Sequence, residues 1–335
     1  MGERYLPDDV LQRVLVGLPL DDHRAAASVC KSFRGIITGP RFFAARRRYG
    51  FAERGVVTVF RGDGVLQIKT AHKSDVMATI PVNRLSYYST TTDGGARLFV
   101  CTRGWSPPTA EDTPGQILAL DPSSRRWRRF ATLPQVRDLH CLMWHAGLLY
   151  VAGGISSSTG IPTNSFHVYS EATGLWEELP PMLHACVRAA SGVIGNELFI
   201  AGGHGPGVGN QDLSTLQIYD ITARTWRLGA QLPNAQHGAY GIVVGDGKLY
   251  LVSSRLSEVQ CMLMYDVQSN TWTEQQGPPA SRTLAVFNAF AHNGRIIALN
   301  EAGSAFQRGP GSDWSRFDLD DVRARENALA GSVLL

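Results

Sequence analysis

A repeat of close to 50 residues constrains the fold of this chain more than any other feature. Each copy has a short apolar strand that ends in a large residue, then a polar turn, then a tryptophan seven positions after the large residue. Intervals of 49, 50 and 46 residues separate the four tryptophans, which are Trp127, Trp176, Trp226 and Trp272. A period of this size indicates supersecondary units that stack on one another, because one such unit cannot bury its own apolar face.

A second apolar strand precedes the first in every copy, and in two copies it ends in paired glycines, Gly153-Gly154 and Gly202-Gly203. A fifth, weaker unit at residues 283–317 keeps Trp314. The pattern predicts four short antiparallel strands in each unit, with the units arranged radially as the blades of a propeller. We expect the tryptophans to pack between blades and the paired glycines to relieve crowding near the axis.

Residues 56–69 predict a further hairpin that turns at Gly62-Asp63-Gly64. This hairpin lacks an inner strand of its own, and residues 331–334 near the C-terminus are apolar enough to supply one. Closure by both ends of the chain removes open sheet edges. We therefore expect six blades rather than five.

The first 50 residues predict helices. Leu6-Pro7-Asp8-Asp9 opens the first helix, since proline is tolerated in the first turn and acids there suit the helix dipole. Asp21 or Asp22 is expected to cap a second helix that presents apolar residues from 26 to 37, and residues 42–48 predict a short third helix. Three short helices form a small core. Part of their apolar surface must be buried either by a partner or by the rest of the chain.

The basic residues of the chain are concentrated in this helical segment. Residues 1–50 contain nine Lys and Arg against five Asp and Glu, whereas the remainder is close to neutral, which gives a net charge of +3 for the chain. The excess peaks at Arg46, Arg47 and Arg48. These cations either dock onto an acidic partner or form the solvated end of a helix, where the dipole favours them. The charge is too small to be a nucleic-acid signature.

The helical segment resembles an F-box. The order and spacing of four elements carry the resemblance: Leu6-Pro7, Leu18-Pro19, Val29-Cys30-Lys31-Ser32-Phe33 and Pro40-Arg41-Phe42. Phe33 stands where tryptophan is more usual in this family. The resemblance implies binding to a Skp-type adaptor, and through it to the cullin scaffold of an SCF ubiquitin ligase. The contact residues that it implies are Leu6, Pro7, Leu18, Pro19, Leu20, Val29 and Phe33.

Residues 85–317 resemble kelch repeats, in which a glycine pair is followed by a Tyr-Asp pair and a tryptophan seven residues after the tyrosine. Cys101-Thr102 and Ser253-Ser254 replace the glycine pair in two units. We therefore predict a small all-α F-box at residues 1–50, followed by an all-β kelch-type propeller at residues 51–335. Plant proteins of this organisation are similar to this chain, and they recognise metabolic enzymes or signalling regulators.

The loops that lead into the inner strands are expected to gather at one mouth of the propeller and to bind the target protein. Basic and aromatic side chains there suit an acidic or hydrogen-bonding segment of a target. The candidates are Arg137, Arg188, Arg282, His184, His237 and Trp105. For the three arginines, the alternative is a structural role on backbone carbonyls of neighbouring blades.

Other functions find less support in the residues. The histidines are scattered at the spacing of the repeat, and phosphate-binding loops and nucleophile elbows are missing. We expect a non-catalytic protein without cofactor or metal, without a nucleic-acid or membrane partner, in the cytoplasm or nucleus. A kelch scaffold that is not linked to ubiquitination is the alternative, and the F-box resemblance argues against it.

Overall fold

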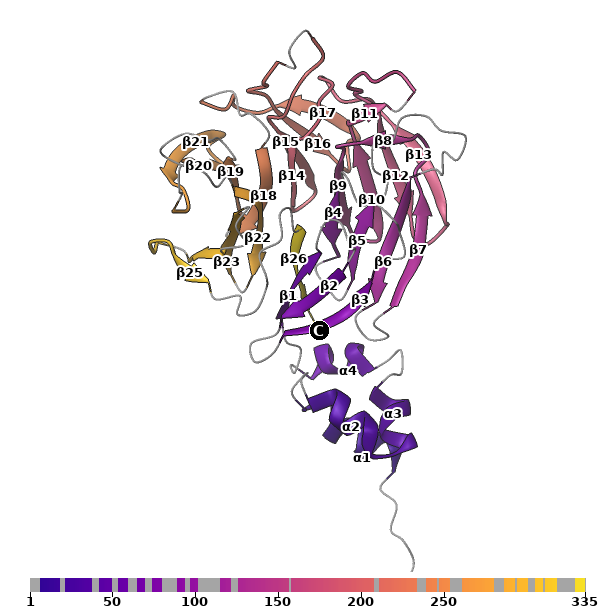
Figure 1. The fold of residues 1–335 in the computed structure, drawn as a ribbon. Helices are drawn as coiled ribbons and strands as arrows, with labels where there is room; N and C mark the ends of the chain where they lie inside the picture. The colour runs from indigo at the N-terminus through magenta and orange to yellow at the C-terminus, as the bar shows by residue number, and fades with distance from the viewer. Residues whose placement is uncertain are drawn as a thin grey trace, which may run out of the picture.

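The computed structural model of this chain describes residues 7–18, 22–37, 42–49, 54–59, 65–69, 74–79, 89–93, 97–101, 115–121, 126–156, 158–207, 211–233, 239–245, 247–253, 261–279, 286–292, 294–300, 305–309, 311–317 and 329–334. These residues form a group of helices and a set of β-sheets arranged in a ring (Figure 1). The division into a helical and a β part is the one that the sequence predicts.

Four helices are described near the N-terminus: α1 (Asp8–Val16), α2 (His23–Val29), α3 (Lys31–Ile37) and α4 (Phe42–Arg48). Helix α1 begins directly after Pro7 and ends at Gly17. Proline fits before the first turn because its missing N–H has no partner there in any helix. Helix α4 has the bounds predicted for the third helix.

The prediction of one continuous helix over residues 26–37 is wrong, because the chain is extended at Cys30 (φ −156°, ψ 170°) and separates α2 from α3. The backbone N–H of Phe33 donates a hydrogen bond to the Cys30 sulfur over 3.4 Å. The thiol thereby takes the place of a side-chain cap at the start of α3, where backbone donors lack partners within the helix. The predicted cap by the Asp22 side chain is not formed.

Five four-stranded sheets each use consecutive parts of the chain. Their strands are β4 (Thr90–Thr92), β5 (Leu98–Cys101), β6 (Gln116–Asp121) and β7 (Arg126–Thr132); β9 (Cys141–His145), β10 (Leu148–Ala152), β12 (Phe166–Ser170) and β13 (Leu175–Leu179); β14 (Ala190–Ile194), β15 (Glu197–Ala201), β16 (Leu216–Asp220) and β17 (Thr225–Leu228); β18 (Ala239–Gly245), β19 (Lys248–Ser253), β20 (Cys261–Asp266) and β21 (Thr271–Gln276); and β22 (Val286–His292), β23 (Arg295–Asn300), β24 (Ala305–Arg308) and β25 (Ser315–Phe317).

One further four-stranded sheet joins the two ends of the β region. It has the order β26 (Leu329–Leu334), β1 (Arg54–Val59), β2 (Val65–Lys69) and β3 (Ser74–Thr79). β26 runs antiparallel to β1, with Leu334 opposite Arg54 and Leu329 opposite Val59. The C-terminal strand thus completes the N-terminal hairpin, the pairing that the sequence predicts for residues 331–334.

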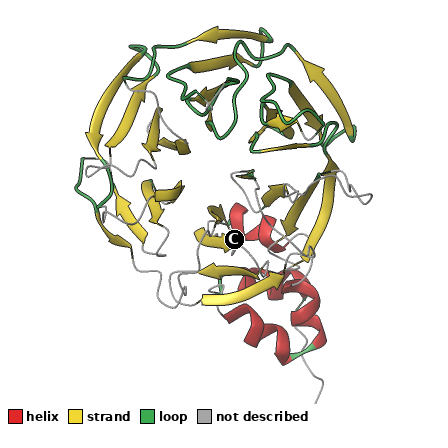
Figure 2. Ribbon diagram, turned by 45° about the horizontal axis from the view of Figure 1, so that its top comes forward, coloured by secondary structure: helices red, strands yellow, loops and turns green. Residues whose placement is uncertain are grey.

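The first strands of the sheets line the inside of the ring. They contact one another in the cyclic order β26, β4, β9, β14, β18 and β22, and β22 returns to β26. Figure 2 shows the sheets around this ring. The sheets form a propeller in which neighbouring sheets pack face to face. Residues of β5 and β6 also share a core cluster with the helices.

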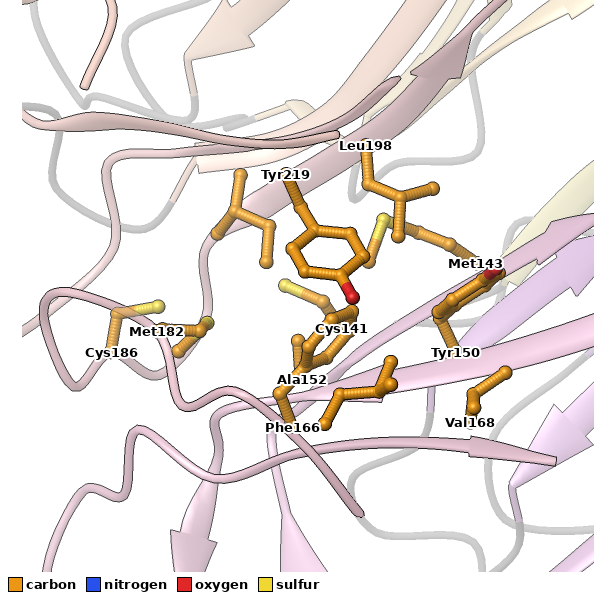
Figure 3. Packing of buried hydrophobic residues seen from close by; sticks show 12 residues of the cluster. Cys141, Met143, Tyr150, Ala152, Phe166, Val168, Met182, Cys186, Leu198 and Tyr219 are labelled. Carbon is orange, nitrogen blue, oxygen red and sulfur yellow. The ribbon is translucent and has the colours of Figure 1, made fainter. Parts of the chain in front are cut away.

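Three of the four tryptophans of the repeat connect neighbouring sheets, as predicted, whereas Trp127 packs against the cluster that includes the helices. The indole N–H donates a hydrogen bond to a carbonyl near the end of the preceding sheet: Trp176 to Thr132 at 2.7 Å, and Trp226 to Pro180 at 2.8 Å. Trp272 bonds to the Ala230 carbonyl in the same way at 2.9 Å. The buried apolar residues of adjoining sheets interdigitate; Figure 3 shows one such cluster, which includes Phe166 and Tyr219. Their ring centroids are 4.8 Å apart.

The two faces of the propeller carry different connections. The tight turns between first and second strands lie on one face; in one of them, Ala146-Gly147, φ is positive at both residues, 47° and 84°, which is the twist that a two-residue hairpin needs. The helices lie on the same side as these turns, below β1 and β3 (Figure 1). The opposite face carries the loops at residues 133–140, 153–165, 180–189 and 202–215. Among the described residues, no helix is long and apolar enough to cross a membrane.

Candidate protein-interaction surfaces

The helical segment exposes three valines. Val10 and Val14 lie one turn apart on α1, with 37% and 60% of their surface exposed, and Val29 at the end of α2 is 69% exposed. Exposed apolar side chains on a segment this small are candidates for contact with another molecule. We call these three residues the valine surface.

The opposite side of α1 is buried. Leu15 and Val16 are each 1% exposed and belong to a cluster with Ile37 and Phe42. The same cluster includes four propeller residues, Leu98, Val100, Leu118 and Leu120. The propeller therefore completes the core of the short helices, while the valine surface remains outside it. Burial by the rest of the chain thus holds for Leu15, Val16, Ile37 and Phe42, and burial by a partner stays a prediction for the exposed valines.

The residues predicted to bind an adaptor divide into three groups. Pro7 and Val29 are exposed. Leu18 and Phe33 are half-buried and pack against the core cluster, so each has one side in the fold and one side at the surface. The remaining three, Leu6, Pro19 and Leu20, lie outside the described residues.

Arg46 has neither of the roles that its cluster of arginines predicts. The side chain is 1% exposed, so it is neither solvated nor available to an acidic partner. One of its terminal nitrogens, Nη1, donates to the Val16 carbonyl at 2.8 Å and also to the Leu18 carbonyl. Arg48, in contrast, is exposed. Arg46 therefore acts inside the helical segment, at the C-terminal end of α1.

On the opposite face of the propeller, the loops that lead into the inner strands pack against the ends of the second strands. Strand β8 (Arg137–Asp138) pairs with β11 (Ile155–Ser156), and at the next sheet Val187 pairs with His204. The amide N–H of Gly154 also bonds to the Cys186 carbonyl at 2.9 Å. The paired glycines permit this close approach of the loops. The prediction that they relieve crowding at the propeller axis is wrong, because they follow the second strand of the sheet and not the innermost strand.

Arg137 is one of the target-binding candidates, and the structure places it in the alternative, structural role. Its side chain is 1% exposed and donates hydrogen bonds to the carbonyls of Gly153 and Ser165, both at 3.2 Å. A further bond reaches the Gln135 side-chain oxygen at 2.9 Å. Burial lowers the pKa of the Arg137 guanidinium to about 10, which still leaves it charged at neutral pH. Arg137 fixes its loop to the sheet and offers no free surface.

Arg188 and His184 are exposed on the loop between β13 and β14. The main chain of His184 is held by Gln217, whose side-chain oxygen accepts its N–H at 2.8 Å and whose amide donates to its carbonyl at 3.1 Å. The backbone N–H of Arg188 donates to the Leu139 carbonyl at 3.0 Å. Both side chains are therefore presented from a fixed backbone. Arg282, His237 and Trp105 lie outside the described residues.

The arginines of these loops do not recur in phase. Asp138 pairs with Ile155, and Val187 pairs with His204 at the corresponding place in the next repeat. Arg137 is therefore equivalent in position to Cys186, and Leu139 is equivalent to Arg188. Leu139 and Arg188 share the left-handed backbone conformation, with φ of 57° and 52°. The equivalent positions in the two loops thus have the same backbone but different side chains, and Arg188 alone of this pair carries a charge.

His140 is buried where its loop enters β9. Burial, together with the positive charge of Arg137, lowers its pKa from 6.5 to about 3. Between these two values the unfolded chain binds a proton that the folded protein rejects, so stability falls as the pH falls from 6.5 towards 3.

We expect wild-type protein to lose about 2 kcal/mol more stability than His140→Leu between pH 7.5 and pH 5, since each unit of pKa difference corresponds to about 1.4 kcal/mol. Urea unfolding of both proteins at the two pH values measures this difference. His145→Leu is the control, and it should keep the wild-type pH dependence. Parallel pH profiles for wild type and His140→Leu would contradict the assignment.

Metal-binding geometry is not found among the described residues, where no three His, Cys, Asp or Glu side chains are grouped closely enough to hold an ion. Cys101, Cys141 and Cys186 are buried thiols outside any disulfide, as predicted, but Cys30 is exposed. His204 is also buried and lies 2.9 Å from the Asp212 carboxylate.

Comparison with protein families matches both parts of the chain. The F-box domain model matches residues 5–44, and the kelch motif model matches residues 144–183 and 185–233. The chain therefore resembles F-box/kelch-repeat proteins in both of its parts. The F-box match covers all four helices except the end of α4, and the kelch matches cover strands β10 to β17.

Relatives with both modules and with the kelch part alone are similar to this F-box/kelch chain. One F-box/kelch-repeat protein of Arabidopsis thaliana is 22% identical over 329 residues, which cover 94% of this chain and 88% of the relative. Another is 26% identical over 52% of this chain and 53% of its own length. Kelch-like protein 34 of Homo sapiens is 26% identical over 60% of this chain, but the match spans only 34% of that protein. In the solved structure of YjhT, 84% of the chain aligns with 71% of this one at a TM-score of 0.57 and 15% identity, which shows a shared fold.

Sequence reasoning missed two residues of the F-box surface, Val10 and Val14. Val10, Leu11, Val14 and Leu15 of α1 cover an arc of about 140° at 100° per residue, and Val16 widens the apolar surface further. A single contact with the core needs less, and the core takes the side of Leu15. The excess width of the stripe was the available signal. On the kelch face, the exposed apolar residues Ile161 (56%) and Leu183 (47%) were also missed; no pattern distinguishes them from ordinary loop residues.

Proposed function

We propose that this chain is the substrate-recognition subunit of an SCF-type ubiquitin ligase. The F-box would bind a Skp-type adaptor on a cullin scaffold, and the kelch propeller would hold a target protein for ubiquitination and degradation. The observation that carries the proposal is the valine surface, which stays exposed although the propeller buries the other side of the same helices. A kelch scaffold without this link would have no use for exposed valines there.

The two faces of the molecule support a positional mechanism. The F-box helices lie on the side of the tight turns, and the long loops lie on the other side (Figure 1). A target bound to the loops and an adaptor bound to the helices can therefore be held at the same time. Holding two reactants together raises the rate of reaction between them without a catalytic residue in this chain. We place this activity in the cytoplasm or nucleus.

The loop face suits a target segment that is acidic or rich in hydrogen-bond acceptors. Arg188 supplies the charge and His184 a further donor, and both are presented by a fixed backbone. Ile161 and Leu183 add exposed apolar area. Arg282, His237 and Trp105 remain proposed contacts of the same face. We further propose that the sheet of β26, β1, β2 and β3 serves as the sixth blade of this propeller.

We expect the double variant Val14→Asp/Val29→Asp to lose adaptor binding by at least about 30-fold, because central apolar residues of an interface each contribute about 2 kcal/mol or more. Both side chains are exposed, so the new carboxylates stay in water in the free protein and the fold is retained. Surface plasmon resonance with a purified Skp-type adaptor measures the affinity.

The control for this test is Leu175→Asp, which changes an equally exposed leucine (68%) on the propeller strand β13. It should bind the adaptor as the wild type does. Wild-type protein that fails to bind the adaptor, or a double variant that binds as tightly as the control, would favour the scaffold function instead.

A further inference from the structure

A buried arginine and a buried histidine meet at the end of α1 in the F-box. Arg46 of α4 donates from Nη1 to the carbonyls of Val16 and Leu18, as described above. The Nε2 atom of His23, the first residue of α2, lies 3.1 Å from the same Leu18 carbonyl and 3.0 Å from Nη1 of Arg46. His23 is 5% exposed, and its ring packs edge-on against Phe42 at 5.1 Å. Three helices thus converge on two backbone carbonyls.

The hydrogens of this group can be assigned consistently. The two protons on Nη1 satisfy the carbonyls of Val16 and Leu18. His23 then carries its proton on Nε2 and donates it to the second lone pair of the Leu18 carbonyl. The last carbonyls of a helix lack partners within the helix, and a cation there also interacts favourably with the helix dipole. Arg46 supplies both a donor and a positive charge at this place.

The group holds the part of the F-box from which the second Leu-Pro pair departs. Gly17 and Leu18 end α1 through weak bonds only, with N–H to carbonyl distances of 3.3 Å to Val14 and 3.2 Å to Leu15. Without Arg46 and His23, little among the described bonds would fix the Leu18 carbonyl. Leu18 follows directly after the helix that carries Val10 and Val14, and His23 begins the helix that ends in Val29. The relative placement of the valine surface and the Leu-Pro turn therefore depends on these two side chains.

We infer that Arg46 and His23 are positioning residues for the adaptor-binding surface of the F-box. The inference rests on the proposed adaptor binding. Neither side chain is exposed enough to touch an adaptor, so both act through the backbone at the end of α1. Arg46→Lys is the conservative change, because both bonds of Arg46 come from the single nitrogen Nη1 and a lysine ammonium also carries several donors on one nitrogen, on a shorter and differently shaped side chain.

The test measures adaptor affinity and local amide exchange in the full chain. We expect Arg46→Met to weaken binding of a purified Skp-type adaptor at least tenfold, Arg46→Lys to weaken it less, and His23→Gln, which keeps an Nε donor at a similar reach, to weaken it least. Arg48→Met is the matched control, since Arg48 is exposed on the same helix, and it should bind within twofold of wild type. In Arg46→Met, amide exchange should accelerate at Gly17 and Leu18 but not in α3.

Three results would overturn the inference, each in a different way. Equal affinity of Arg46→Met and Arg48→Met would show that the buried arginine does not position the surface. Faster amide exchange throughout α1, α2 and α3 of Arg46→Met would show that the arginine stabilises the whole helical segment. In that case His23→Gln, the milder change, would lose adaptor affinity only in proportion to its unfolded fraction. Wild-type protein that does not bind the adaptor would overturn the proposed function and the inference with it.

Discussion

Deletion of residues 329–335 is expected to abolish cooperative folding of the propeller. The deletion removes β26, which pairs with β1 over its whole length and contacts the inner strands β22 and β4 on either side. Without it, β1 becomes an open edge and the ring loses the sheet that links its two ends. A ring that is interrupted at one sheet exposes the apolar faces of both neighbouring sheets, so the loss extends beyond one strand.

We expect the deletion to remove most of the free energy of unfolding, which is about 5–15 kcal/mol for a folded domain. Urea denaturation followed by tryptophan fluorescence measures it, because the tryptophans lie between sheets. Deletion of Leu335 alone leaves β26 whole and serves as the control. An unchanged midpoint and slope for the longer deletion would show that the propeller does not need β26 for closure.

Gly203→Ala is expected to destabilise the kelch propeller far more than Gly147→Ala. The two glycines have the same backbone angle, φ +84°, so the strain of a side chain in the left-handed region is the same for both. They differ in their surroundings. A Cβ on Gly203 would lie 2.5 Å from the Val187 carbonyl oxygen and 2.9 Å from the Ala189 nitrogen, whereas a Cβ on Gly147 would meet nothing within 4 Å.

Both atoms that would meet the new methyl group belong to the backbone of the 180–189 loop, which cannot move without breaking the Val187–His204 pair. We expect a cost of about 1 kcal/mol for Gly147→Ala, from backbone strain alone. For Gly203→Ala we expect about 3 kcal/mol or more, in the range of the severe single substitutions. Chemical denaturation of the two variants measures the difference directly, and equal losses would show that the loop yields.

The repeat made most of the propeller predictable. A tryptophan seven residues after a large apolar residue is a local pattern, and it recurs because every sheet must bind the preceding one in the same manner. The bonds from Trp176, Trp226 and Trp272 to carbonyls of the preceding sheet are that repeated contact. The strands, the hairpin turns and the pairing of the two ends followed from the same periodicity.

The helical segment was predictable in part. Pro7 and Gly17 bound α1 as expected, since their effects on the backbone are local. The break at Cys30 was missed, because the apolar positions on both sides keep a helical spacing and the sulfur that caps α3 has no strong capping preference. The F-box and kelch patterns supplied the two interaction surfaces, but not the side chains that remain exposed on them.

The sequence by itself determined what kinds of element form, how often they recur and where the two modules divide, because turns, apolar periods and repeats act over short stretches of chain. Only the tertiary structure decided which polar side chains became part of the framework. Arg137 and Arg46 look like surface cations in the sequence, yet both are buried on backbone carbonyls supplied by distant residues. Burial depends on what the rest of the chain places around a residue, and that information is not local. The exposed valines of α1 were hidden for the same reason, since the side of the helix that the propeller covers is set by the assembled fold.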